Sequence, residues 1–143
     1  MRLLLSCDLA VIQSIYIFNK AGNMLFNHDV VEHQINAMLV GAFLSAIESW
    51  AEMYSQSGIA LFMTGSMKLI FGQKPEYAPE LVFCIAAGKN HDEKDLNEKM
   101  ELLLENFMHF FWQDRVSMEH GVIPVDKIEE FRHIVEDLLQ HRE

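Results

Sequence analysis

The sequence predicts a mixed α/β domain in which one five-stranded antiparallel sheet is covered by helices on both faces. Five short runs rich in β-branched and aromatic residues are bounded by Gly, Asn or Pro, as strands are. Three longer segments repeat apolar residues every three or four positions, which is the helical period. The order along the chain is strand, strand, helix, strand, strand, strand, helix, helix. This order favours a three-layer arrangement with one helix on one face of the sheet and two on the other.

The first two strands are expected to form a hairpin. Residues 11–18 are rich in Val, Ile, Tyr and Phe, and the turn-forming residues 19–23 separate them from the apolar run 24–26. Three more β-prone runs come after the first helical segment. They predict a meander of strands at residues 59–63, 67–71 and 81–86.

The first helix is expected at residues 32–54. The second is expected to start at residue 90 or 92 and to end just before residue 121. After Pro124, the residues Asp126 and Glu129 have the spacing of a capping box. They predict the start of a third helix, which is amphipathic and therefore suited to packing on a sheet.

The composition indicates one domain, residues 1–143, that is long enough to fold without a metal or a disulfide. Half of the residues are apolar, but no apolar run has the length of a membrane span. The formal net charge of −10 disfavours nucleic acid and direct membrane insertion, because it repels phosphate groups.

The two cysteines and the start of the chain indicate the cellular compartment of the protein. Cys7 and Cys84 lack the spacing of a zinc site or a disulfide framework, so we interpret both as reduced core thiols. The apolar run after Met1 is too short for a secretion signal, and Asp8 follows it closely. We therefore expect a cytoplasmic protein that reaches membranes only through its partners.

Part of the sequence resembles the longin and roadblock domains. Ile-Tyr-Ile-Phe at 15–18 and Leu-Phe at 25–26 are similar to their hairpin, and Leu-Val-Gly-Ala-Phe-Leu-Ser-Ala-Ile at 39–47 is similar to the helix that follows. Roadblock domains begin with an additional helix, for which residues 1–10 are too short and irregular, so longin is the better match. The resemblance implies an adaptor that pairs with a similar domain and serves a small GTPase or a vesicle-trafficking complex.

The first helix carries the predicted interface. It has no charge between Ile35 and Ile47 and is apolar on both sides. One side would pack on the sheet, and no further element of the chain is expected to cover the other. We therefore expect a homodimer, or a heterodimer with a related domain, through this second side. The expected interface residues are Ala37, Val40, Gly41, Leu44, Ile47, Glu48 and Ala51.

The sequence predicts no catalytic residue, cofactor or metal. Gly65-Ser66 and Gly88-Lys89 lack the glycine spacing of a phosphate loop, and we interpret them as turns. The chain has neither a nucleophile elbow nor a His-Glu-x-x-His pair. Its seven histidines are scattered, which is typical of solvated side chains and not of metal ligands.

Three alternatives remain open from the sequence. The aromatic residues Phe110, Phe111 and Trp112 could form a binding patch, although packing under the last helix is favoured. A small-molecule sensor of profilin-like shape would need a pocket between sheet and helix, which the nine methionines and ten phenylalanines could line. An enzyme is the third, because carboxylates are plentiful and their pairing in space cannot be seen in a sequence.

Overall fold

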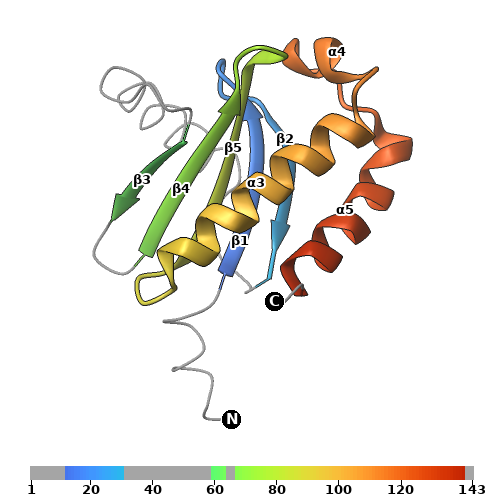
Figure 1. The fold of residues 1–143 in the computed structure, drawn as a ribbon. Coiled ribbons are helices and arrows are strands. Elements are labelled where there is room, and N and C mark those ends of the chain that lie inside the picture. The colour runs from blue at the N-terminus through green and yellow to red at the C-terminus, as the bar shows by residue number, and fades with distance from the viewer. Residues whose placement is uncertain (1–11, 31–58, 64–66, 141–143) are drawn as a thin grey trace.

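The computed structural model describes residues 12–30, 59–63 and 67–140 (Figure 1). The predicted helix at residues 32–54 lies outside the described residues. The strands are β1 (Ile12–Asn19), β2 (Met24–Asp29), β3 (Ile59–Met63), β4 (Met67–Lys74) and β5 (Ala78–Gly88). The described helices are α3 (Glu93–Phe110), α4 (Arg115–Glu119) and α5 (Val125–Gln140).

The five strands form one antiparallel sheet in the order β2-β1-β5-β4-β3. An antiparallel sheet agrees with the prediction, but β2, β4 and β5 are longer than the apolar runs that predicted them. The polar end of β2 shows why, because Asp29 still pairs with Ser14 of β1 and accepts a hydrogen bond from its hydroxyl at 2.9 Å. Backbone pairing thus continues beyond the apolar residues.

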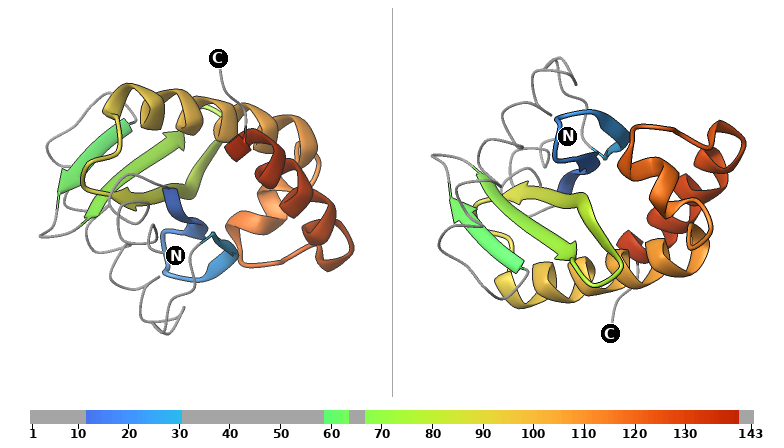
Figure 2. Two further views of the ribbon diagram at one scale, coloured as in Figure 1. Left: turned by 90° about the horizontal axis from the view of Figure 1, so that it is seen from below. Right: turned by 90° about the horizontal axis from the view of Figure 1, so that it is seen from above.

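Alternate residues of the strands point to opposite faces of the sheet. In β5, Phe83 and Ile85 lie in a larger core cluster, whereas Val82 and Cys84 lie in a smaller one. The larger cluster includes buried side chains of α3 and α5, and these helices lie side by side on one face of the sheet (Figure 2). This placement of the C-terminal helices agrees with the prediction. The smaller cluster lies on the other face and comprises Tyr16, Phe18, Leu69, Phe71, Val82, Cys84 and Ala86.

The second helical segment is broken where the sequence predicts a continuous helix. α3 ends at Phe110, and the backbone N–H of Phe111 closes it by donating to Phe107 O at 2.8 Å. A turn follows before α4 begins. The prediction is wrong because α4 packs at the end of the sheet, where Met118 is fully buried and Glu119 O accepts a hydrogen bond from Asn19 at 3.2 Å. A straight continuation of α3 would carry both residues past this position.

α5 begins directly after Pro124, as predicted, but the capping box is wrong. Pro124 O already accepts a hydrogen bond from Lys127 N at 2.9 Å, so the helical turn starts before Asp126. The carboxylate of Asp126 therefore lies within the first turn, where it opposes the positive end of the helix dipole. None of the described helices combines the length and the apolar character that crossing a bilayer requires.

Candidate protein-interaction surface

The interface predicted on the first helix lies outside the described residues and stays a prediction. This applies to Ala37, Val40, Gly41, Leu44, Ile47, Glu48 and Ala51. The strand that follows this segment, β3, lies at one edge of the sheet and is paired with β4. Leu61 and Met63 of β3 are 38% and 56% exposed. An apolar edge strand with exposed side chains is a template to which another chain can add.

The smaller core cluster contains a buried thiol. Cys84 and its neighbour Val82 are fully buried, and Tyr16 is nearly so. Burial raises the pKa of the Cys84 thiol, and burial also raises the pKa of Tyr16 against the opposing effect of a hydrogen bond with Ser14. A buried, protonated thiol is unreactive, so the prediction of a reduced core cysteine is confirmed for Cys84. Cys7 lies outside the described residues.

Trp112 lies at the surface, in the turn between α3 and α4. Its side chain contacts the ring of Tyr77 in the turn between β4 and β5, with ring centroids 5.5 Å apart and ring planes at 63°. The guanidinium carbon of Arg115 lies 3.6 Å from the centre of the indole. Arg115 Nε also donates to Tyr77 O at 3.1 Å, and its Nη1 donates to Trp112 O. Arg115 therefore joins the two turns and holds both aromatic side chains in place.

The three aromatic residues at the end of α3 have different surroundings. Phe111 is fully buried, and Phe110 stacks on Phe131 of α5 with ring centroids 5.8 Å apart. The prediction that they pack under the last helix is confirmed for these two residues. It is wrong for Trp112, which is 44% exposed, because the helix ends at Phe110 and the turn directs the indole outward.

Further exposed apolar side chains follow Trp112 in the chain. Val116 lies on α4, Val122 and Ile123 lie between α4 and α5, and Val125 begins α5. With Tyr77 and Trp112, they make up most of the large apolar side chains that are exposed in the described part of the chain. Exposed apolar side chains in one stretch of the chain, and in the turn that contacts it through Tyr77 and Trp112, indicate a protein-binding surface. We call it the Trp112 surface; it comprises Tyr77, Trp112, Val116, Val122, Ile123 and Val125.

Polar contacts attach the Trp112 surface to the end of the sheet. The side chain of Asn19, the last residue of β1, donates to Glu119 O at 3.2 Å. The carboxylate of Glu119 in turn accepts a hydrogen bond from Glu80 N of β5 at 2.9 Å. Gly121 follows with a φ of +89°, a conformation that favours glycine and lets the chain turn toward α5. Hydrogen bonds therefore fix the backbone of α4, which carries part of the exposed apolar side chains, to the sheet.

Several carboxylates lie beside residues of the Trp112 surface. Lys127 of α5 forms an ion pair with Asp114 at 2.8 Å. The hydrogen bond to Asp114, together with the charges of Asp114, Asp126 and Glu130, raises the pKa of Lys127. Glu76 is exposed in the turn beside Tyr77. These carboxylates outnumber the neighbouring cations, as the net charge of the chain leads one to expect.

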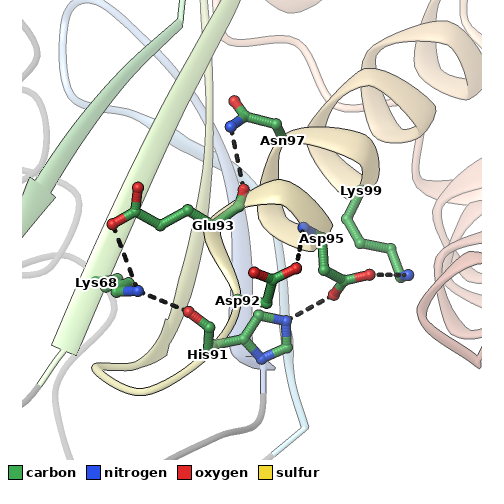
Figure 3. A network of polar contacts seen from close by, with 7 residues as sticks. All are labelled: Lys68, His91, Asp92, Glu93, Asp95, Asn97 and Lys99. Atoms are coloured by element: carbon green, nitrogen blue, oxygen red, sulfur yellow. Dashed lines mark hydrogen bonds and ion pairs between the residues drawn. The ribbon is translucent and has the colours of Figure 1, made fainter.

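A separate network of charged residues lies at the N-terminal end of α3 (Figure 3). Lys68 of β4 and Lys99 of α3 are only 7% and 6% exposed. Lys68 Nζ donates to His91 O at 2.6 Å, and Lys99 Nζ lies 3.0 Å from Asp95 Oδ1. The other oxygen of Asp95 lies 2.6 Å from His91 Nε2. The network therefore joins β4 and the turn after β5 to the first turns of α3.

The charges of this network compensate one another. Burial acts to raise the pKa of Asp95, but hydrogen bonds with His91 and Lys99 outweigh it, and the pKa is lowered. Asp95 is thus held as a carboxylate, and we interpret the network as structural. The prediction of solvated histidines is wrong for His91, which the network holds, and confirmed for His133, whose side chain is 78% exposed. Among the described residues, no three His, Cys, Asp or Glu side chains are grouped to hold a metal ion.

Comparison with solved structures identifies the fold. The chain is similar to a crystal structure of a Roadblock/LC7 domain from Streptomyces avermitilis, with a TM-score of 0.59 and 14% identity over 78% of this chain and 98% of that one. MglB from Myxococcus xanthus has a TM-score of 0.45 and 8% identity over 57% and 68% of the two chains. The gliding protein MglB from Thermus thermophilus has a TM-score of 0.42 and 10% identity over 64% and 72%. No protein-family model and no curated protein matches the sequence.

The chain therefore has the roadblock fold. The sequence favours longin over the related roadblock domain because of the short segment at residues 1–10. Those residues lie outside the described part, and the structural match is to a roadblock domain. At 14% identity, this likeness identifies the fold and not the partners of the protein.

Proposed function

We propose that this chain is a non-enzymatic adaptor that pairs through the helix predicted at residues 32–54 and serves as a platform for a small GTPase or a trafficking-type complex. The roadblock fold supports the proposal, because the resemblance in the sequence implies adaptors of this class.

The exposed edge at β3 is the observation that carries the proposal of pairing. β3 is five residues long and contains no charge, and its residues Leu61 and Met63 are exposed on the same side of the strand. Because Leu61 and Met63 are only partly exposed, covering them would gain a part of the roughly 1.5–3 kcal/mol that full burial of such a side chain contributes. A second copy of the chain, or a related domain, would cover them and pair with β3, the edge strand of the sheet in the described part of the chain.

The helix predicted at residues 32–54 directly precedes this edge in the sequence, so that both would contribute to one contact. Across a two-fold axis, Val40, Leu44 and Ile47 would meet the same residues of the second copy. An adaptor of this kind would act on a GTPase by contact alone, because its own sequence carries no phosphate loop.

Light scattering on the wild type and on Leu44→Glu tests the pairing. We expect the wild type to have twice the mass of one 16.5 kDa chain and the variant to be monomeric, since a charge at the centre of the contact loses its solvation without gaining a partner. Val30→Glu, at an exposed valine of the hairpin edge, is the control and should remain dimeric. Circular dichroism checks the folding of each variant.

A monomeric wild type would contradict self-pairing, and an unfolded Leu44→Glu would assign Leu44 to the core. The platform role is tested by titrating a small GTPase of the same organism against the wild type and Leu44→Glu. We expect measurable binding to the wild type and weaker binding to the monomeric variant. Absence of binding for every GTPase of that organism would contradict the platform role.

A further inference from the structure

The Trp112 surface lies away from the edge strand that the proposed pairing uses. Figure 1 shows α4 at one end of the sheet, beside the turn between β4 and β5, whereas β3 forms a side edge. Within the Trp112 surface, Val116, Val122 and Val125 are 54%, 57% and 77% exposed. Pairing through the edge strand β3 gives these side chains no role. Exposed apolar side chains of this kind indicate a second binding partner.

The aromatic part of this surface is preformed. Arg115 lies against the indole of Trp112 and donates hydrogen bonds to Tyr77 O and Trp112 O, which fixes the relative position of the two rings. Aromatic side chains that are held in place lose little conformational freedom on binding, and Trp, Tyr and Arg are the residues that dominate binding energies at interfaces. The arrangement therefore suits an anchor point for another protein.

The charges around the surface indicate the chemistry of that partner. Two cations beside it, Arg115 and Lys127, are engaged with the carbonyls of Tyr77 and Trp112 and with Asp114. Glu76 and Glu80 are exposed on either side of Tyr77, and for their side chains no ion pair is found within the described part of the chain. Two further lysines lie nearby, since Lys74 ends β4 just before this turn and Lys20 N donates to Glu80 O at 2.9 Å. A partner with positive charges beside its apolar residues would neutralise the excess of carboxylates.

We propose that the Trp112 surface binds a segment of a partner protein in which apolar side chains are flanked by lysine or arginine residues. The apolar side chains of the segment cover Trp112 and Val116, and its cations meet Glu76 and Glu80. A second copy of this chain fits less well, because two acidic surfaces would face each other. An anionic membrane is disfavoured by the same charge.

Fluorescence anisotropy with two labelled synthetic peptides tests the proposal on the full chain. Both peptides carry the same leucines at helical spacing, and the remaining positions are lysine in one and glutamate in the other. We expect the lysine peptide to bind and the glutamate peptide not to bind. The affinity for the lysine peptide should fall as salt is added, because exposed charges contribute to it.

Two pairs of variants locate the binding site. Val116→Asp should weaken the lysine peptide about tenfold or more, as loss of a contact at the centre of an interface does. Val30→Asp, at a valine 47% exposed on the hairpin, is the matched control and should bind like the wild type. Glu76→Gln combined with Glu80→Gln should also weaken binding and reduce its dependence on salt. Glu98→Gln combined with Glu101→Gln, two exposed residues of α3, should change neither.

The same measurements distinguish the proposed peptide segment from a second copy of the chain and from a membrane. Equal binding of the two peptides, no binding of either, or equal loss in Val30→Asp would overturn the proposal. A lower mass of Val116→Asp in light scattering would assign the surface to a second copy instead. Binding to vesicles that contain phosphatidylserine, lost in Val116→Asp, would assign it to a membrane. Failure of the pairing proposal is distinguished from these results, because Leu44→Glu changes the mass of the protein and leaves the Trp112 surface intact.

Discussion

The Nε2 atom of His91 lies 2.6 Å from the Oδ2 atom of Asp95, and this contact fixes the turn after β5 to the start of α3. The other Asp95 oxygen pairs with the buried Lys99, and Asp95 N donates to the N-cap residue Asp92 at 3.2 Å. The Asp95 carboxylate therefore joins the turn before the helix to Lys99, one turn further along α3. Replacing Asp95 should therefore lower the free energy of unfolding of the whole domain.

We expect Asp95→Asn to lower the free energy of unfolding by about 1 kcal/mol at pH 7, because the amide keeps the hydrogen bonds only in part and removes the negative charge that faces Lys99 and His91. The lowered pKa of Asp95 means that its stabilisation is present above the pKa of an unfolded aspartate and is lost as the pH falls through the folded pKa. The difference between variant and wild type should therefore shrink below about pH 4. Urea unfolding at several pH values measures it, with Asp137→Asn, an exposed residue of α5, as the control. A difference that is constant with pH would contradict this role.

Phe131 is expected to be the most sensitive position of α5. Its ring contacts those of Phe26, Phe107, Phe110 and Phe111, with centroids between 5.0 and 5.9 Å away. Phe131→Ala should lower the free energy of unfolding by about 3–5 kcal/mol, because it leaves a cavity among rings that α3, α5 and β2 share. Phe131→Leu fills most of that volume and should lose less than half as much. Equal losses for both variants in denaturant titrations would show that ring geometry matters more than volume.

The thiol of Cys84 should be protected in the folded protein. Burial raises its pKa and excludes reagents, so a disulfide reagent should modify it only when the sheet opens. In a Cys7→Ser variant, which leaves Cys84 as the one cysteine of the chain, the reaction should be slow in buffer and fast in denaturant. Rapid modification under native conditions would show that the second face of the sheet is accessible.

The purified protein is expected not to bind or hydrolyse nucleotide by itself. It has no phosphate loop, and its net charge of −10 repels phosphate groups. Calorimetric titration with GTP and with ATP should give no heat beyond dilution. A micromolar affinity for either would favour an enzyme or a sensor over an adaptor.

Much of the sheet could be predicted from the sequence because its local patterns are strong. The alternation in β5 separates Phe83 and Ile85 from Val82 and Cys84, and these pairs do lie on opposite faces. The polar end of β2 could not be predicted in the same way. It continues as a strand because β1 provides hydrogen-bonding partners, which a run of apolar residues does not reveal.

The candidate surface was only partly predictable. The sequence drew attention to Trp112 but favoured its burial, since helical periodicity places it in a continuous helix. No pattern links it to Tyr77, which lies 35 positions earlier in the chain and comes into contact only when α3 ends beside the turn between β4 and β5. The same holds for Lys68 and His91, whose contact depends on how β4 and β5 pair.

The sequence by itself determined the order of the strands, the antiparallel sheet and the acidic character of the protein, because each follows from residue types and from their spacing within short segments. Only the tertiary structure decided where the long helical segment ends and which apolar side chains remain in water. Phe111 and Trp112 are adjacent and both aromatic, yet one is fully buried and the other is 44% exposed. The physical reason is that burial depends on neighbours distant in the sequence, here the rings of Phe107 and Phe131, and these neighbours are set by the packing of α3, α5 and the sheet.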